Sequence, residues 1–292
     1  MAEENMLGRY QNRALPICIT MNDNQNIHTW LSQGTALFVA RRYEKAVARF
    51  DKILLSSPTH AEAWSKRGYS LHEIGMYREA IESFSQAIQY EPKESLHWQG
   101  KGITLAKLER YDEAIDSFER ATRLNPRDIK AWYNKGYANL RVFRYREAIA
   151  CFDRVVELRP NNYRAWYNRG VSQAALRRYN DALSSLDTAI AIKRSCHYAW
   201  SHRGIVLNKL GRYVEAVQSF DQSLALKEDN PEAWYGKACC YSLQQDLRQS
   251  VRSLHRALVL SPHLYRVMAI GDNSFDEIRQ SEEFRNLVGA TS

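Results

Sequence analysis

The sequence has 292 residues, a formal net charge of +8, 45% hydrophobic residues and a mean hydropathy of −0.54. These values are typical of a soluble protein. We find no apolar run long enough to span a bilayer and no signal pattern at the start, so we expect a cytoplasmic location. The five cysteines match no metal-ligand spacing, and we expect buried thiols with neither a metal nor a cofactor.

Residues 1–26 precede the regular part of the sequence. Their periodicity is weak, and they contain Pro16 and the polar stretch MNDNQN. We expect an N-terminal arm that is partly disordered or forms a short accessory helix.

A period of 34 residues runs without insertion from residue 27 to residue 264. All seven tryptophans fall on it, and the phrases AWYNKGY at 131–137 and AWYNRGV at 165–171 show it most plainly. A catalytic motif is needed once, whereas a packing motif recurs wherever the same packing is rebuilt. The period therefore predicts seven structural repeats, at 27–60, 61–94, 95–128, 129–162, 163–196, 197–230 and 231–264.

Each repeat has the pattern of a helical hairpin. In the fourth repeat, Trp132 and Gly136 share one face of a first helix, and Ala148 and Phe152 share one face of a second. Glycine inside a helix costs about 1 kcal/mol relative to alanine, so its recurrence needs a reason. We expect Gly136 and Ala148 to face each other where the helices approach closely, with the tryptophan in the core.

Proline is expected to end most of the second helices, because it disfavours helix in the residue before it. In the fifth and sixth repeats Arg194 and Glu228 take the place of this proline, and we expect less sharply defined helix ends there. The prolines are Pro58, Pro92, Pro126, Pro160 and Pro262.

Residues 265–292 lack the repeat pattern and are predicted to form C-terminal capping helices. Ser274 and Glu277 have the spacing of a capping box. An apolar stripe would cover the open end of the seventh repeat, as a stack of repeats requires. The stripe consists of Phe275, Ile278, Phe284, Leu287 and Val288.

The order of Trp, Gly, Tyr, Ala, Phe and Pro within 34 residues resembles the tetratricopeptide repeat (TPR), and the ending resembles those of bacterial, notably cyanobacterial, TPR chains. The resemblance covers residues 27–264. It implies an all-α fold, a right-handed superhelical solenoid of seven helix-turn-helix repeats. It also implies a non-enzymatic module that binds protein segments in a concave groove. The fold alone does not identify the partner.

A helical wheel leaves one face of the first helices uncommitted, after one face is assigned to the partner helix and one to the next repeat. This face is rich in tyrosine, arginine and asparagine, which suit the binding of an extended peptide backbone. The residues predicted to bind a peptide are Lys130, Tyr133, Asn134, Tyr137 and Arg141 in the fourth repeat, and Arg164, Tyr167 and Asn168 in the fifth.

Charge indicates what kind of segment would bind. Residues 129–162 hold seven Lys or Arg against three Asp or Glu, and residues 163–196 hold six against two. We therefore expect an acidic segment, and an adaptor, assembly-factor or scaffold role. A plainer alternative is that Lys130, Arg141 and Arg164 only keep the surface soluble. The family's clamp for chaperone tails is matched only by Asn134, with Arg164 as a conservative substitute, so we do not expect that specificity.

Other chemistry has weak signals in the sequence. HEIGM at 72–76 lacks the second histidine of a zinc-protease helix, and the neighbours Cys196 and His197 point apart. Nucleic-acid binding is the alternative function, because the pI is about 9.2. Against it, six cations are expected between repeats: Arg67, Lys101, Lys135, Arg169, Arg203 and Lys237.

Overall fold

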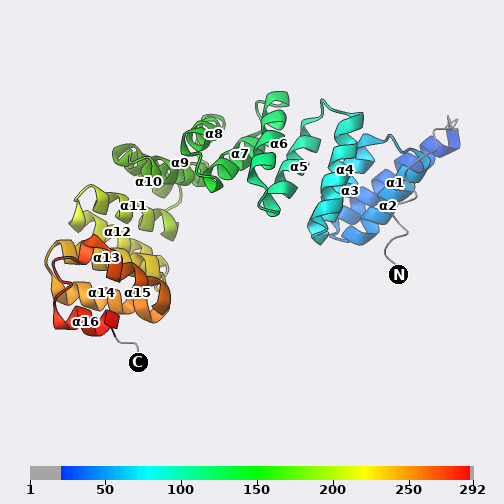
Figure 1. Cartoon of the computed structure of the whole chain (residues 1–292). Helices are drawn as coiled ribbons and strands as arrows, with labels where there is room; N and C mark the ends of the chain where they lie inside the picture. Colours follow the sequence, from blue (N-terminus) through cyan, green and yellow to red (C-terminus); the bar gives the residue numbers. More distant parts are fainter. Residues whose placement is uncertain (1–20, 290–292) are drawn as a thin grey trace. The chain divides into compact units, whose positions relative to one another are not determined.

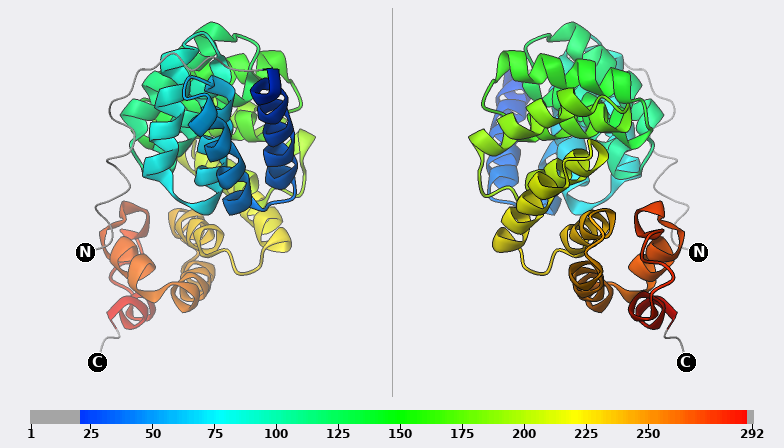
Figure 2. Two further views of the ribbon diagram at one scale, coloured as in Figure 1. Left: turned by 90° about the vertical axis from the view of Figure 1, so that its right-hand side faces the viewer. Right: turned by 90° about the vertical axis from the view of Figure 1, so that its left-hand side faces the viewer.

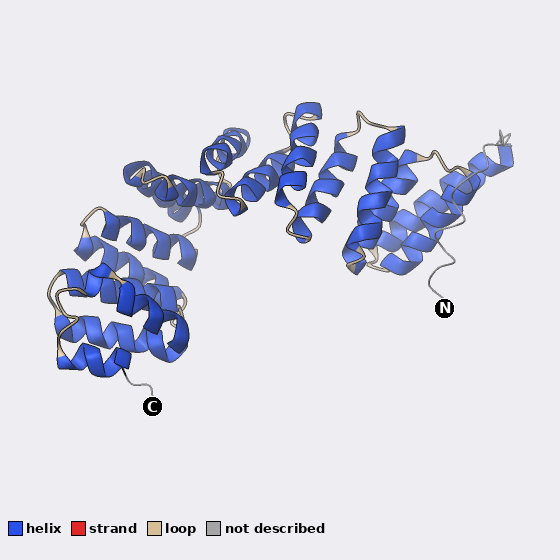
Figure 3. Cartoon of the chain, in the orientation of Figure 1, coloured by secondary structure: helices blue, strands red, loops and turns tan. Residues whose placement is uncertain are grey.

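The computed structural model describes residues 21–289 (Figure 1). This range contains sixteen α-helices and one 3₁₀ helix, and none of its residues lies in a β-strand (Figure 3). The first helices of the repeats are α1 (Met21–Val39), α3 (Ala61–Ile74), α5 (Ser95–Lys107), α7 (Ile129–Arg141), α9 (Tyr163–Ala175), α11 (His197–Lys209) and α13 (Pro231–Leu243). The second helices are α2 (Tyr43–Ser56), α4 (Tyr77–Tyr90), α6 (Tyr111–Leu124), α8 (Tyr145–Leu158), α10 (Tyr179–Ile192), α12 (Tyr213–Leu226) and α14 (Leu247–Leu260).

The chain divides into two compact units between Leu108 and Glu109. In the first unit, α1 packs on α2, α3 packs on α4, and α5 continues the stack on α4. In the second unit, α6 packs on α7, and the pairs α7–α8, α9–α10, α11–α12 and α13–α14 follow in order. Each unit is therefore a stack of helices with the predicted period. The two helices of residues 95–128 fall on either side of the division.

The glycines that recur at the repeat period make room for a large side chain of the second helix, which is a phenylalanine ring at Gly34, Gly68, Gly136 and Gly204 and Leu186 at Gly170. A Cβ atom on Gly136 would lie 2.9 Å from Cε1 of Phe152 and 3.1 Å from the Cβ of Cys151. Both residues belong to α8, so close approach of the paired helices is confirmed. The predicted contact with Ala148 is replaced by one with Phe152, because the ring needs the space that a side chain on the glycine would occupy.

Each hairpin turn contains one residue with a left-handed backbone. Gly75 and Gly211 have φ values of 91° and 75°, and the other turns place a non-glycine residue there. All seven positions are separated by the repeat period, so the turn geometry recurs as the helices do. The non-glycine residues are Arg41, Glu109, Phe143, Arg177 and Gln245.

The tryptophans are only partly buried, so the expectation of core residues holds for one part of each ring. Trp166 packs beside Phe152 and Val155, while its indole Nε1 donates a hydrogen bond to the Pro160 carbonyl at 2.8 Å. Six tryptophans bond the carbonyl six residues before them in this way. The indole needs a surface position because it ties the loop between repeats to the following helix.

A cation joins each of five tryptophans to the preceding repeat. The Arg169 guanidinium lies 5.3 Å from the centre of the Trp166 ring, and its Nε donates to Asp153 of α8 at 2.5 Å. Its Nη1 donates to Ser185 of α10 at 2.7 Å. Arg67 and Arg203 repeat the whole arrangement, and Lys135 and Lys237 repeat the ring contact and the ion pair. Five of the six cations expected between repeats are therefore confirmed there.

The second helices end in register whether or not proline follows. Helix α8 ends at Leu158 before Pro160, and α10 and α12 end 34 and 68 residues later, at Ile192 and Leu226. The expectation of less defined ends beside Arg194 and Glu228 was wrong. The carbonyls of both residues accept the hydrogen bond from the next tryptophan, which fixes the exit without proline.

The two ends of the described range differ from the predicted boundaries. Helix α1 already begins at Met21, so MNDNQN is helical, whereas the remainder of the predicted arm lies outside the described residues. At the other end α15 (Pro262–Gly271) begins inside the predicted seventh repeat, followed by η2 (Asn273–Phe275) and α16 (Glu282–Gly289).

These C-terminal elements cover the last helix pair. Phe275, Ile278 and Phe284 are buried in one cluster with Tyr235 of α13 and Leu254 of α14, and the three helices lie against that pair in Figures 1 and 2. The predicted stripe is confirmed, but the capping box is not.

The caps in this segment come from other residues. Asp272 accepts from Ser274 N at 2.9 Å, and Ser281 accepts from Phe284 N at 3.2 Å. Ser274 therefore receives a cap instead of providing one, and the second cap lies seven residues later.

None of the helices within residues 21–289 has the length and apolar character needed to cross a bilayer.

Candidate functional site

The predicted binding residues lie on α7 and α9, both in the second unit. The start of each helix is held by a side chain: Asp128 accepts from Lys130 N at 2.9 Å and Asn162 accepts from Ala165 N at 3.2 Å. The side chains of Lys130 and Arg164 leave the first turns of these helices and are exposed. An anion held by them would also face the positive end of the helix dipoles.

Tyr133 and Asn168 form a joined pair between the two helices. Asn168 Nδ2 donates to the Tyr133 hydroxyl at 3.0 Å, and the Tyr133 ring packs edge-on against Phe152 at 5.8 Å. Asn168 is only 7% exposed. Burial raises the pKa of Tyr133, and the hydrogen bond from Asn168 opposes this. Asn168 therefore positions Tyr133 and is itself largely buried, whereas the helical wheel had placed it on the open face.

Tyr167 belongs to the contact between α9 and α11. Its ring packs edge-on against Tyr198 at 4.6 Å and against His202 at 5.2 Å, and its hydroxyl lies 3.4 Å from His202 Nδ1. Burial raises its pKa. The neighbouring repeat covers most of the Tyr167 side chain, so little of it is open to a ligand.

The exposed side chains near the end of α7 are aromatic and cationic. Tyr137 is 40% exposed, and the exposed Arg141 guanidinium lies 5.1 Å from the centre of the Tyr111 ring on α6. Arg141 also approaches the Tyr137 hydroxyl at 3.5 Å and Glu109 at 4.0 Å, both of which are weak contacts. Asn134 is partly exposed on the same helix.

Two residues that sequence reasoning missed complete the surface beside Arg164. The Tyr163 hydroxyl accepts from Arg164 Nε at 3.2 Å and from Lys193 Nζ at 3.2 Å. The Lys193 ammonium lies 4.7 Å from the centre of the same ring. Burial raises the pKa of Tyr163, but hydrogen bonds from Arg164, Lys193 and Tyr198 outweigh it and lower the pKa overall.

The only sequence feature that pointed to the cluster of Tyr163, Arg164 and Lys193 was the excess of basic residues in the fifth repeat. Lys193 follows α10, 29 residues after Arg164, so a wheel drawn for one helix could not place it beside that residue. We call Lys130, Tyr137, Arg141, Tyr163, Arg164 and Lys193 together the basic rim, in which Lys130 and Arg141 lie at opposite ends of α7.

The described structure lends no support to a zinc site at residues 72–76 or to a catalytic pair at Cys196 and His197. His72 Nδ1 lies 3.0 Å from the Thr104 hydroxyl, and Cys196 is buried with Ile190 and Ala199. Within residues 21–289, no group of three or more His, Cys, Asp or Glu side chains is arranged to hold a metal ion.

Comparison with solved structures finds repeat proteins of the same architecture. YrrB, described as a TPR protein with an unusual peptide-binding site, is 20% identical over 65% of this chain and 98% of its own, with a TM-score of 0.55. The C-terminal part of a TPR repeat-containing protein from Cytophaga hutchinsonii is 16% identical over 85% of this chain and 99% of its own, with a TM-score of 0.66. MamA from Desulfovibrio magneticus RS-1 is 20% identical over 58% and 96%, with a TM-score of 0.56.

The sequence itself matches two repeat families. The tetratricopeptide repeat family matches residues 31–97, 144–195 and 172–231, which together exceed half of the chain, and a TPR repeat family matches residues 102–142. A search of curated proteins gave no match. On the strength of these matches and of the helix pairs with their 34-residue period, the chain belongs to the tetratricopeptide repeat family.

Proposed function

We propose that this protein is a non-enzymatic adaptor or scaffold that binds an extended, acidic segment of a partner on the basic rim of the second unit. The TPR fold supports binding to protein, and the similarity to YrrB, a TPR protein with an unusual peptide-binding site, is in line with this. The acidic character of the segment rests on the rim itself.

The observation that carries the proposal is the difference between two kinds of cation. Arg67, Arg169 and Arg203 are mostly buried and each is paired with an aspartate of the preceding repeat. Arg164 and Lys193 instead contact a tyrosine ring and its hydroxyl, and no ion pair to a carboxylate is found for either in the described part of the chain. Cations held in place without a counter-charge suit an incoming carboxylate.

Tyrosine adds the contact area that charge alone lacks. Tyr163 and Tyr137 offer rigid rings at little cost in entropy, and Tyr133 is fixed beside them by Asn168. A segment with acidic side chains spaced along an extended backbone would reach both Lys130 on α7 and Arg164 on α9.

Titration of the full-length protein with a fluorescein-labelled decapeptide of alternating Glu and Ser would test this. We expect Arg164→Gln with Lys193→Gln to weaken binding about tenfold, since each removes a charge-assisted contact. The control pair, Arg120→Gln with Arg146→Gln, removes the same charge from exposed positions of α6 and α8 and should change binding less than about twofold. Equal weakening by both pairs would show that the rim supplies only general charge.

Salt dependence separates this function from nucleic-acid binding. Affinity for a single-stranded oligonucleotide resting on many phosphate contacts falls by about 10³ or more between 50 and 200 mM salt. We expect the peptide to lose far less, because tyrosines carry part of its contact. An oligonucleotide that displaces the peptide at 200 mM salt would favour the alternative function.

A further inference from the structure

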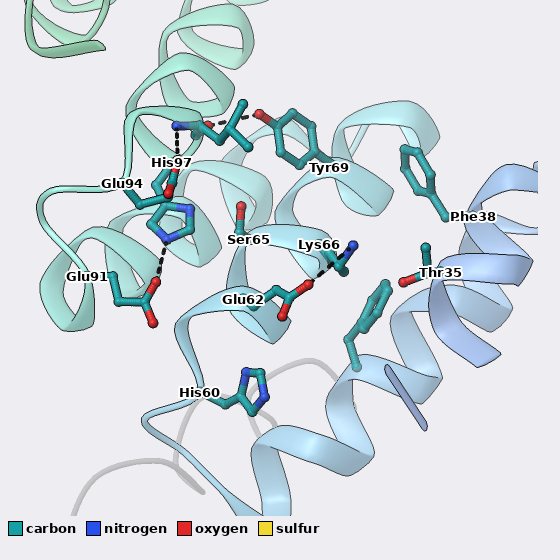
Figure 4. Close-up of a pocket in the computed structure, with 12 residues that line it drawn as sticks. Thr35, Phe38, His60, Glu62, Ser65, Lys66, Tyr69, Glu91, Glu94 and His97 are labelled. Atoms are coloured by element: carbon teal, nitrogen blue, oxygen red, sulfur yellow. Dashed lines mark hydrogen bonds and ion pairs between the residues drawn. The ribbon is translucent and has the colours of Figure 1, made fainter. Parts of the chain in front are cut away.

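The first unit contains a second candidate binding site, a cavity of about 640 Å³ between α1, α3 and the start of α5 (Figure 4). It is separate from the basic rim in residues and in compact unit. Its walls include the Phe38 and Tyr69 rings, and its polar groups come from α1, α3, the turn that leads into α5, and α5 itself. The polar and charged side chains that matter below are Glu62, Lys66, Glu91, Glu94 and His97.

His97 is a buried polar side chain with its hydrogen-bonding capacity unused. It is 3% exposed, and neither ring nitrogen has a hydrogen-bond partner among the described residues. Nε2 lies 3.7 Å from a Glu91 carboxylate oxygen, which is too long for a hydrogen bond. Buried polar groups almost always have a partner, so the unused hydrogen-bonding capacity of His97, which lines the cavity, needs an explanation. Because burial lowers the pKa of His97, the neutral ring offers one acceptor nitrogen.

The charge around the cavity is negative. Lys66 is paired with Glu62 at 3.5 Å, which leaves the Glu91 and Glu94 carboxylates without a balancing cation among the lining residues. Glu94 Oε1 accepts from Leu96 N at 3.1 Å, so this carboxylate is held at the start of α5. Residues 61–94 hold six acidic against four basic residues, the opposite balance to the fourth and fifth repeats.

We propose that this cavity binds an arginine side chain presented on an extended partner segment. Two carboxylates and a neutral imidazole acceptor suit the several donors of one planar guanidinium better than the point charge of an ammonium. Phe38 and Tyr69 provide aromatic faces for the guanidinium or its aliphatic stem. A cavity of this volume holds a side chain together with flanking backbone, which favours a peptide over a free cation.

The test follows the His97 ring signal of the full-length protein by NMR during titration with the capped tripeptide Ac-Gly-Arg-Gly-NH2. We expect a saturable shift of this signal. The same peptide with citrulline, which keeps the shape but has no charge, should bind at least about tenfold more weakly. The citrulline comparison uses wild-type protein, so its result does not depend on whether any variant folds.

Variants then test whether the carboxylates of Glu91 and Glu94 contribute to binding of the arginine tripeptide. Glu91→Gln with Glu94→Gln should weaken binding of the arginine tripeptide about tenfold. Glu44→Gln with Glu82→Gln removes the same charge from exposed positions of α2 and α4 and should leave the affinity within about twofold. Equal binding of the citrulline peptide, or no shift of the His97 signal, would overturn the proposal. Equal binding of methylguanidinium alone would overturn its peptide part.

Discussion

At the scale of single residues, the turns show how a repeat tolerates local strain. Five of the seven turn positions hold a non-glycine residue in the left-handed region, where a side chain costs about 1 kcal/mol. At the six turns other than the one at Glu109, the flanking helices pack on each other and fix the turn between them. Glycine at these sites is therefore an energetic advantage and not a requirement of the fold.

Substitutions at these turns should change stability in opposite directions. Gly75→Ala should lower the free energy of unfolding by about 1 kcal/mol, because a Cβ there meets no atom within 4 Å and only the backbone is strained. Arg177→Gly should raise it by about 0.5 kcal/mol. Urea denaturation measures both, and a loss of stability in Arg177→Gly would show that its side chain makes a contact that outweighs the strain.

Tryptophan substitutions should separate packing from hydrogen bonding. Trp166→Ala should cost about 3 kcal/mol, near the low end for large aromatic residues, because the ring is only partly buried. Trp166→Phe keeps a ring beside Phe152 but loses the bond to the Pro160 carbonyl, and should cost about 1 kcal/mol. Unfolding midpoints of Trp166→Ala near that of wild type would contradict the packing role.

At the scale of helices, five of the six junctions between repeats combine an apolar contact with a charged latch. The latch joins three helices, since Arg169 of α9 reaches Asp153 on α8 and Ser185 on α10. The Arg169 side chain is 25% exposed and Asp153 is 41% exposed, so solvent screens the pair in part. The main role of this latch is to fix the position of one repeat relative to the next.

A double-mutant cycle measures this latch. We expect Arg169→Gln and Asp153→Asn to show a coupling energy of about 1 kcal/mol in urea unfolding, above the usual range of exposed pairs because the guanidinium is mostly buried. The pair Arg178 and Asp181, exposed on both sides, provides the control and should show a smaller coupling. Equal coupling in both cycles would mean that burial adds nothing to the latch.

The Lys135 latch makes one contribution to stability dependent on pH. Its hydrogen bond lowers the pKa of Glu119 below the ordinary value of 4.5. A carboxyl with a lowered pKa in the folded state stabilises the fold above its unfolded pKa, and the effect is lost as pH falls through the folded pKa. The difference in unfolding free energy between wild type and Lys135→Met should therefore shrink between pH 7 and about pH 3. A difference that stays constant over this range would contradict this assignment.

At the scale of the whole molecule, the period made the fold predictable, while the binding surface was predictable only in part. Because the pattern recurs along the chain, helix lengths and turns are predicted together, and the absence of proline at Arg194 and Glu228 leaves the helix ends in register. A helical wheel describes one helix in isolation. It could not show that a neighbouring repeat buries Asn168 or that Lys193 reaches Tyr163.

Stacked repeats also predict how damage spreads. Stability in such proteins is approximately a sum of repeat and nearest-neighbour terms, so Trp166→Ala should weaken its own surroundings most. We expect faster amide hydrogen exchange in α8, α9 and α10 and unchanged rates in α1 to α4. Uniformly faster exchange throughout the chain would instead indicate one cooperative folding unit.

The indole bonds to the carbonyls between repeats have a practical consequence. Six of the seven tryptophans lie where one helix pair meets the next, with a cation or a loop carbonyl beside the ring. Their fluorescence is therefore a natural reporter of the individual junctions. Variants that retain a single tryptophan would reveal, from emission wavelength and quenching, which junction loosens first when the protein is stressed.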